Sequence, residues 1–300
     1  MFKMAKAMIV VNPSSGSEEA KKYVDQLKNE LENQFDEMTV KVTTKAGDAM
    51  QFADEAAAQQ YDALFLMGGD GTINEGINGI AKHGYRPCVG VIPLGTVNNF
   101  ARALDIAMQP EEAIAEMKTA IRKEIDIGKV NETYFVSTVS VGPIPESVQE
   151  VDVDSKTKFG PLAYVFQGLK ALNDERTTLF ELTVDGETWE ERFSMVLVAL
   201  SNSVTGIGTV FSSAEIDDGY LQLLGLRETT AVEKLALIPE LFRDSEDYSN
   251  KLFLKKFKKA TLSTKGTESF VCTVDGDSGP TFPIEVEVFH NYISVFAPHR

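Results

Sequence analysis

Residues 62–80, "DALFLMGGDGTINEGINGI", join a hydrophobic run to a cluster of glycines and then to a helical pattern. The run at 63–67 is typical of a buried strand, and the spacing of apolar residues predicts a helix over 73–81. Glycines between a strand and a helix leave backbone N–H groups accessible to phosphate. Asp70 stands in this loop, where a carboxylate would repel phosphate. A nearby Mg²⁺ would cancel that repulsion, directly or through water.

The alternation of strand and helix continues through the first 130 residues. Strand patterns occupy 7–11, 38–44, 63–67 and 88–93. Helix patterns occupy 17–35, 48–60, 73–81 and 110–123, with Ser17 as an N-cap and Pro110 in a first turn. This order predicts an α/β domain with a doubly wound, mostly parallel sheet and with ligands at the carboxyl ends of its strands.

From about residue 125 the pattern becomes β-rich, and Asp185-Gly186 is a strong hairpin signal. We expect a sandwich-like or barrel-like second domain, interrupted by helices near 162–172 and 231–242. The predicted domains are 1–128 and 129–289. The final strand pattern, 284–296, either closes the second sheet or crosses back, in which case 290–300 packs onto the first domain.

Three loops follow predicted strands in the first domain: "NPSSG" at 12–16, "GGDGT" at 68–72 and "PLGTVN" at 93–98. A tight turn is the simpler explanation of any one of them. Three such loops at successive crossovers favour a phosphate site. The chain has no G-x-x-x-x-G-K-[ST] motif, which excludes a P-loop protein, and no G-x-G-x-x-G after its first strand, which weakens the case for a dinucleotide redox enzyme.

Composition limits the class of protein. The 300 residues are 43% hydrophobic and 25% charged, as in an ordinary globular protein, and the formal charge of -16 argues against a nucleic-acid binder. No apolar run approaches the ~18 residues of a membrane-spanning helix. Cys88 and Cys272 are expected to be buried free thiols, and the protein is expected in the cytoplasm.

"GGDGTINEGINGI" followed by "VIPLGTVNNFARAL" resembles the bacterial diacylglycerol kinase family of soluble lipid kinases, whose patterns are GGDGTxNExxNG and PxGTxNDFAR. "VVNPSSG", "TTKAGDA", "DIGKVNETYFV", "SSAEIDDGYLQLL" and "TVDGDSGP" extend the resemblance over most of the chain. GGDG alone is shared with NAD kinases. The resemblance implies Mg²⁺-dependent transfer of phosphate from ATP to the hydroxyl of diacylglycerol or a related lipid, which gives phosphatidic acid. It also implies an active site in the cleft between the two domains.

The resemblance assigns roles residue by residue. The positions that it implies for ATP binding are Asn12, Ser14, Ser15, Gly16, Thr43 (or Thr44), Gly68, Gly69, Asp70, Gly71, Thr72, Asn74, Glu75, Gly95 and Thr96. The implied metal ligands are the Asp218 carboxylate and the backbone carbonyls of Glu215 and Tyr220. Asp275 and Asp277 fall where the family places its base, and with Asp70 they form the implied catalytic set. The simpler explanation of 217–219 and 275–277 is that acids beside glycine make turns.

The chain departs from the family pattern at several positions. Asn99 replaces the aspartate of N-D-F, Asp277 is one methylene shorter than the usual glutamate, and "SVGPIPESV" at 140–148 replaces a glycine-rich stretch. Three hypotheses therefore stay open. The chain is a lipid kinase, or a catalytically weak or non-catalytic relative that binds nucleotide or lipid as a regulator, or a kinase for a soluble substrate such as NAD.

The segment "KLFLKKFKKATL", 251–262, contains five lysines and no acid. It suits contact with anionic lipid, worth about 1 kcal/mol per lysine near such a surface. It equally suits an edge strand that turns its lysines outward. We expect a membrane lipid as substrate, reached by transient contact with the inner surface of the membrane, and no nucleic-acid partner. A homodimer is compatible with the sequence.

Overall fold

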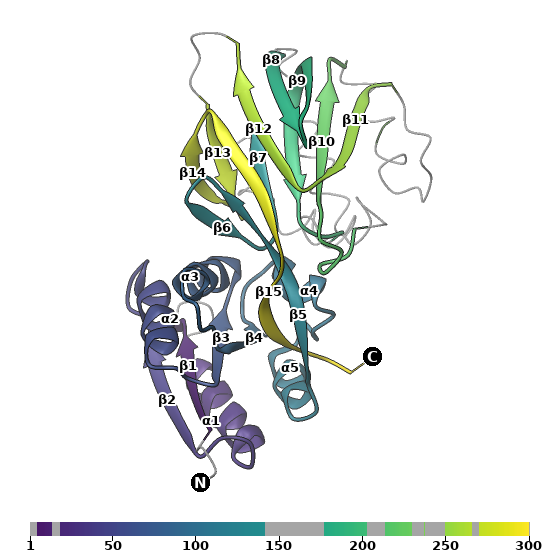
Figure 1. Cartoon of the computed structure of the whole chain (residues 1–300). Coiled ribbons are helices and arrows are strands. Elements are labelled where there is room, and N and C mark those ends of the chain that lie inside the picture. The colour runs from purple at the N-terminus through teal and green to yellow at the C-terminus, as the bar shows by residue number, and fades with distance from the viewer. Residues whose placement is uncertain are drawn as a thin grey trace. The chain divides into compact units, whose positions relative to one another are not determined.

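The computed structural model describes residues 5–13, 19–141, 177–202, 214–229, 237, 250–265 and 270–299 (Figure 1). The chain divides into two units. An α/β unit is formed by 1–127, 134–136 and 290–300, and a β-rich unit by 128–133 and 137–289. The α/β class of the first unit and the β-rich class of the second confirm the predicted fold class.

Four parallel strands lie side by side in the sheet of the α/β unit, in the order β2-β1-β3-β4. They are β1 (Lys6–Val11), β2 (Glu37–Val42), β3 (Ala63–Gly68) and β4 (Cys88–Pro93). Every residue of β3 and β4 is buried. Both faces of these strands are therefore covered, which explains their uninterrupted apolar sequences.

Helices cover the two faces of this sheet. They are α1 (Glu19–Leu31), α2 (Asp48–Ala58), α3 (Asp70–Ala81), α4 (Asn99–Ala103) and α5 (Pro110–Met117). α2 packs against α3 and α1 against α5, and Figure 1 shows these pairs on opposite sides of the sheet. The buried face of α1 is the one that its 3.6-residue period predicts: Ala20, Tyr23, Val24, Leu27 and Leu31.

Several helix boundaries differ from the sequence prediction, and α1 ends at Leu31 rather than at 35. α3 begins at Asp70, three residues before the expected start, and α4 was not expected. α5 ends at Met117, and 121–123 lie instead in strand β5 (Ile121–Val130). β5 pairs with the last strand of the chain, β15 (Ile284–Ala297). This pairing joins segments far apart in the sequence, so a local helical period could not reveal it.

The β-rich unit is an antiparallel sheet in the order β14-β13-β7-β9-β8-β12-β15, with β10 paired to β9 and β11. Its strands are β7 (Thr138–Val141), β8 (Thr178–Val184), β9 (Glu187–Ala199), β10 (Leu221–Arg227), β11 (Leu252–Phe257), β12 (Lys259–Thr264), β13 (Val271–Val274) and β14 (Asp277–Thr281). The short β6 (Thr133–Phe135) pairs with β5. The hairpin predicted at Asp185-Gly186 joins β8 to β9, and both residues have positive φ, 47° and 90°.

The last strand, β15, forms both of the pairings that were considered as alternatives for 284–296. Ile284 to Glu287 pair antiparallel with β12, and Val295 pairs parallel with Val89 of β4. Asn291, with φ 49°, lies between these two stretches. Phe296 stacks on Phe65 of β3 with ring centroids 5.5 Å apart, so the end of β15 is part of the core of the α/β unit.

The helices expected at 162–172 and 231–242 lie outside the described residues, apart from Leu237. Within the described part of the chain, no helix is both long and apolar enough to cross a bilayer. Cys88 and Cys272 are buried and free, as expected. Burial raises the pKa of the Cys88 thiol to about 12 and that of Cys272 to about 11, so both are protonated near neutral pH.

Candidate active site

The predicted phosphate loops leave one edge of the parallel sheet in the α/β unit. Val11, the last residue of β1, is in register with Val42 and Met67, and Gly68 with Pro93. The four strands therefore end at the same level. The segments that follow them, 12–13, 43–47, 69–72 and 94–98, gather at this carboxyl edge, which is where ligands bind in open α/β sheets.

Asn12 and Thr72 tie two of these segments together. Asn12 Nδ2 donates to Thr72 Oγ1 at 3.0 Å, and the Asn12 N–H donates to the carbonyl of Met67. Thr72 is buried and fills the space beside Gly68, where an added Cβ would come within 2.5 Å of Thr72 Oγ1. Gly68 is therefore required by packing. Its role as a phosphate ligand stays a prediction.

The loops at 69 and 95 touch through their main chains. A Cβ on Gly95 would lie 2.6 Å from Gly69 Cα and 2.7 Å from Asn98 Oδ1. Only glycine allows this approach. Since Gly71, Gly95 and Thr96 remain exposed, the contact fixes both loops and leaves their outer main chain open to solvent. Exposed main chain of this kind suits a phosphate at Gly71 and Thr96. The Gly95 N–H is already engaged, because it donates to Asn98 Oδ1.

Asn98 holds the loop at 94–98 in shape. It adopts the left-handed conformation (φ 53°, ψ 52°) and is almost completely buried. Its Oδ1 accepts from the Gly95 N–H at 3.0 Å, its Nδ2 donates to the Gly95 carbonyl at 2.9 Å, and its own N–H donates to Asp70 Oδ2 at 2.8 Å. The sequence pattern places Asn98 in this loop and predicts no role for its side chain. The signal was available, because asparagine is enriched at left-handed positions.

Asp70 has partners that its position beside a phosphate loop did not predict. Its carboxylate accepts N–H groups from Asn98, Asn99 and Phe100, at the start of α4. Burial raises the pKa of Asp70, while these three hydrogen bonds and the charge of Arg102 lower it. The Asp70 carboxylate therefore needs no Mg²⁺ to be stable in this loop, because backbone amides satisfy it. The predicted Mg²⁺ beside Asp70 stays a prediction. Asn99 takes part through its backbone N–H, which any residue but proline would supply.

The segment after β2 is held by two acids. Asp48 Oδ2 accepts the backbone N–H and the hydroxyl of Thr44, both at 2.8 Å, and these two hydrogen bonds are the main reason that its pKa is lowered. Glu75 of α3 accepts the N–H groups of Gly47 and Ala49. Of the two threonines considered as ATP contacts, Thr43 is buried and Thr44 is exposed. Thr44 is therefore better placed to meet a ligand, while Glu75 positions the loop.

Asn74 and Asn78 face a different part of the α/β unit. Asn78 Nδ2 donates to the Tyr134 carbonyl at 2.9 Å and its Oδ1 accepts the Tyr134 N–H at 2.9 Å, so this side chain pairs with β6 as another strand would. Asn74 Nδ2 reaches the same carbonyl at 3.4 Å. The sequence analysis assigned Asn74 to ATP and overlooked Asn78, because a long-range partner leaves no local sequence signal.

In the β-rich unit, the hairpin at 274–277 carries both predicted bases. Asp275 has φ 48°, and its Oδ1 accepts the N–H groups of Ser137 and Thr138 at 2.9 and 2.8 Å. Asp277 begins β14 and its side chain is exposed. In this hairpin Asp275 therefore binds the start of β7, while Asp277 is exposed to solvent.

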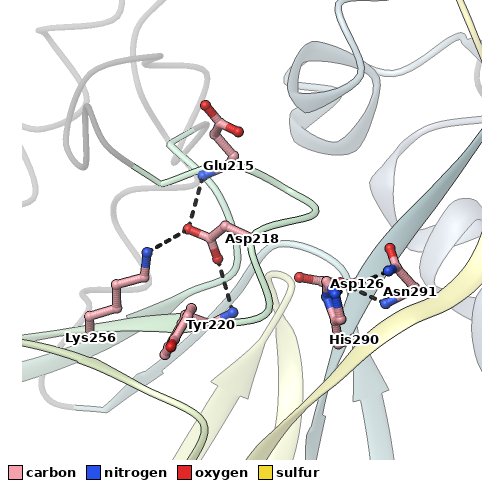
Figure 2. A network of polar contacts seen from close by, with 7 residues as sticks. All are labelled: Asp126, Glu215, Asp218, Tyr220, Lys256, His290 and Asn291. Atoms are coloured by element: carbon pink, nitrogen blue, oxygen red, sulfur yellow. Dashed lines mark hydrogen bonds and ion pairs between the residues drawn. The ribbon is translucent and has the colours of Figure 1, made fainter.

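The three predicted metal ligands lie in one turn, 215–220, shown in Figure 2. Asp218 Oδ1 accepts the Tyr220 N–H at 2.9 Å, and its Oδ2 receives the Glu215 N–H at 3.5 Å. Lys256 Nζ lies 3.0 Å from the same Oδ2. One carboxylate and two carbonyls are the hard oxygen ligands that Mg²⁺ prefers. With the ammonium of Lys256 on this carboxylate, however, the turn as it stands does not fit a divalent ion.

Figure 2 also shows Asp126 of β5, an acid for which the sequence predicts no role. Asp126 is fully buried. Its Oδ1 accepts from His290 Nδ1 and from the Asn291 N–H, both at 2.8 Å. This cluster holds β15 to β5 at the left-handed residue Asn291, so His290 has a structural partner. Within the described residues, no group of three or more His, Cys, Asp or Glu side chains could hold a metal.

Ser14, Ser15 and Gly16 lie outside the described residues, so their predicted contacts with ATP stay predictions. The structure gathers Asn12, Gly68, Gly69, Asp70, Gly71, Thr72, Gly95 and Thr96 at one sheet edge. It gathers Glu215, Asp218 and Tyr220 in one turn and Asp275 and Asp277 in one hairpin. The predicted cleft between the domains and the predicted domain boundaries stay predictions.

Comparison with known proteins gives matches over nearly the whole chain. The model for the diacylglycerol kinase catalytic domain matches residues 6–130, and the model for the YegS C-terminal NAD kinase beta sandwich-like domain matches 137–297. A diacylglycerol kinase of Bacillus subtilis (strain 168) is 33% identical over 98% of this chain and 97% of its own length. One of Staphylococcus carnosus (strain TM300) is 32% identical over 98% and 95%. A crystal structure described as that of a putative diacylglycerol kinase from Bacillus anthracis str. Sterne is similar to this chain, with a TM-score of 0.84 and 26% identity. The match covers 99% of this chain and 98% of the other chain.

Proposed function

Because this chain belongs to the diacylglycerol kinase family, we propose that it transfers phosphate from ATP, with Mg²⁺, to the hydroxyl of diacylglycerol or a closely related membrane lipid. Family membership makes the chain a kinase with an alcohol as phosphate acceptor. The identity of the acceptor, the donor and the metal are parts of the proposal. The observation that carries it is the pair of interlocked glycine loops at the carboxyl edge of the parallel sheet.

Phosphoryl transfer through a loose transition state requires mainly positioning and charge neutralisation. The loops at 69–72 and 94–98 supply rigid main chain for the first task, since Asn98 and Asp70 bind each loop to the other. Rigid amide groups aimed at a phosphate need no reorganisation when charge moves to its oxygens. In this proposal the main chain of Gly71 and Thr96 contacts the phosphates, and Thr44 borders the same edge. Gly95 shapes the loop, because its N–H and carbonyl are bound by Asn98.

When bound, Mg²⁺ neutralises the phosphate oxygens and orients them. A Mg²⁺ ion in kinases is usually held by one or two carboxylates together with the phosphates of the substrate and with water. Asp70 is the acid of the phosphate loop at 68–72, but its carboxylate already accepts hydrogen bonds from three backbone N–H groups. We therefore assign Asp70 to the positioning of α4 and the 94–98 loop, and we expect the metal to enter with the nucleotide.

The base is assigned to Asp277. A general base must reach the hydroxyl whose proton it takes, and the exposed Asp277 side chain is accessible for this. The Asp275 carboxylate is engaged with the N–H groups of Ser137 and Thr138, which fits a positioning residue. An asparagine at 275 keeps an oxygen that can accept these hydrogen bonds, whereas an asparagine at 277 cannot take a proton.

The test is transfer of labelled phosphate from ATP to diacylglycerol in mixed micelles with Mg²⁺. Asp277→Asn should lower kcat by about 10²–10⁴-fold, the usual contribution of general-base catalysis, with an unchanged melting temperature. Asp275→Asn should retain most of the activity and serves as the matched control. Full activity of Asp277→Asn would refute the assignment of the base. Absence of transfer to any lipid by the wild type would refute the proposed function.

A second candidate function rests on Asn99, which stands where the family pattern has aspartate. The missing charge would suit a weak or non-catalytic relative that binds nucleotide or lipid as a regulator. Tight ATP binding without turnover on lipid or NAD would support this candidate, and turnover on NAD alone would indicate a soluble substrate. Asn99→Asp should raise kcat if the missing charge limits catalysis.

Contact with the membrane is proposed to be transient. β11 pairs with β10 and with no second strand in the described part of the sheet, so it is an edge strand there. Lys256 and Lys259 have acidic partners within the chain, Asp218 for the first and Glu285 and Glu287 for the second. Lys255 and Lys258 have none among the described ion pairs and would carry most of the attraction. In a co-sedimentation assay, a smaller fraction of the double variant Lys255→Ser/Lys258→Ser than of the wild type should bind to phosphatidylserine vesicles.

A further inference from the structure

The turn between 214 and 220 is organised around one carboxylate. Asp218 accepts the Tyr220 N–H on Oδ1 and the Glu215 N–H on Oδ2, and the Asp218 N–H returns to the Glu215 carbonyl at 3.4 Å. Gly219, with φ 77°, allows the chain to reverse. The Asp218 side chain is only 16% exposed. A carboxylate so little exposed needs a nearby positive charge or several donors, because burial disfavours the charged form.

That positive charge comes from β11. Lys256 pairs in register with Gln222 of β10, two residues after Tyr220, so its side chain starts close to the turn. Its ammonium lies 3.0 Å from Asp218 Oδ2 and 4.5 Å from the centre of the Tyr220 ring (Figure 2). The Tyr220 ring also faces the ammonium of Lys258 at 4.9 Å. A carboxylate and an aromatic face together form a site for a cation.

An ammonium and a divalent ion compete for this carboxylate. Mg²⁺ needs close, nearly octahedral oxygen ligands and would have to approach Oδ2, where the Lys256 ammonium already lies. Two like charges on one oxygen repel strongly in a partly buried place. The Lys256 side chain is 45% exposed, so its ammonium has room to move into solvent. It leaves the carboxylate only if binding of the metal ion releases more free energy than the ion pair with Asp218 and the contact with the Tyr220 ring together provide.

We propose that the Lys256 ammonium is the resident cation of the 214–220 turn and takes the place of the divalent metal ion that the family pattern puts on Asp218. The turn and the β10–β11 pair then keep their structure without Mg²⁺. Any Mg²⁺ dependence of catalysis arises with the nucleotide, at a different place in the chain.

The proposal is tested without nucleotide or lipid, so the outcome does not depend on the proposed function. Thermal unfolding and isothermal titration of the wild type should be the same in EDTA and in millimolar Mg²⁺. Lys256→Met removes the charge and keeps much of the hydrophobic stem. This variant should gain a Mg²⁺ site and a melting temperature that rises with Mg²⁺ concentration, as binding to the folded state requires.

Three further variants make the result specific. Lys255→Met alters the neighbouring lysine of β11, whose ammonium lies over Trp189 at 4.6 Å, and should stay insensitive to Mg²⁺. Lys256→Arg keeps a cation and should also stay insensitive. Adding Asp218→Asn to Lys256→Met should abolish the gained response.

A Mg²⁺-dependent rise in the melting temperature of the wild type that Asp218→Asn removes would overturn the proposal. A folded Lys256→Met variant that binds no Mg²⁺ would overturn it as well. If Lys256→Met does not fold even in high Mg²⁺, the wild-type and Asp218→Asn titrations still decide the question, because they ask directly whether Asp218 holds a metal ion.

Discussion

Asn98 combines an unusual conformation with three hydrogen bonds at the edge of the sheet. Its side chain satisfies both the N–H and the carbonyl of Gly95, and its N–H reaches Asp70. Asparagine is one of the few residues with a side chain that adopts φ near 53° at small cost. The residue therefore fixes the shape of the 94–98 loop and its attachment to the phosphate loop at once.

Replacing Asn98 should separate these contributions. Asn98→Ala removes the partners of the part-buried N–H and carbonyl of Gly95, at no more than about 1–3 kcal/mol. It also forces alanine into the left-handed region, at about 1–2 kcal/mol more. Asn98→Gly avoids the second cost and should be the more stable of the two. Urea unfolding measures the difference. Equal stability of the two variants would show that the backbone conformation relaxes when the side chain is lost.

At the scale of elements, the two glycine loops depend on a close contact between their main chains. Gly95→Ala would place a methyl group 2.6 Å from Gly69 Cα. We expect overpacking to lower the free energy of unfolding by about 1–3 kcal/mol and to weaken ATP binding, because the loops must move apart. Gly84→Ala is the matched control, since an added Cβ there meets no atom within 4 Å. Fluorescence titration with an ATP analogue compares the two, and equal affinities would contradict the expectation.

The N-terminus of α2 should show a specific pH dependence. Hydrogen bonds from the Thr44 N–H and hydroxyl lower the pKa of Asp48 in the folded state. The stability that they supply is present above the unfolded pKa of about 3.9 and is lost as pH falls through the lower, folded pKa. Asp48→Ala should therefore be less stable than wild type at pH 7, and the difference should shrink at pH 3. A difference that is constant with pH would mean that the ionised carboxylate is not the cause.

At the scale of the whole molecule, β15 contributes to the cores of both units. Ile293 belongs to its later part, in the α/β unit, and Ile284 begins its earlier part, in the β-rich unit, opposite Leu262. Both isoleucines are almost completely buried. The strand thus contains one buried isoleucine in each unit, so each unit can be destabilised separately by a substitution of the same kind.

Each of the variants Ile293→Ala and Ile284→Ala should cost about 2–5 kcal/mol. Hydrogen exchange locates the loss. We expect faster exchange mainly in β4 and β5 for Ile293→Ala, and mainly in β8 and β12 for Ile284→Ala, because buried contacts are lost locally. Equal acceleration throughout the chain in both variants would show instead that the two units unfold as one.

Much of the fold could be predicted because its signals are local. The apolar runs at 63–67 and 88–93 became β3 and β4, the period of α1 identified its buried face, and Asp185-Gly186 formed the expected hairpin. The glycine loops could also be identified from the sequence. The structure shows that packing requires these glycines, against Thr72 at Gly68 and between the two loops at Gly69 and Gly95.

The sequence by itself determined the alternation of strands and helices, the loops at the sheet edge and the resemblance to a lipid kinase family, because backbone sterics and burial periodicity act between near neighbours. Only the tertiary structure decided the partners that Asp70 and Asp218 have from distant parts of the chain. Asp70 accepts the N–H of Asn98, 28 residues away, and Asp218 pairs with a lysine of strand β11. Both partners are set by which strand ends and turns the fold brings together, and the interaction of a carboxylate depends on distance in space.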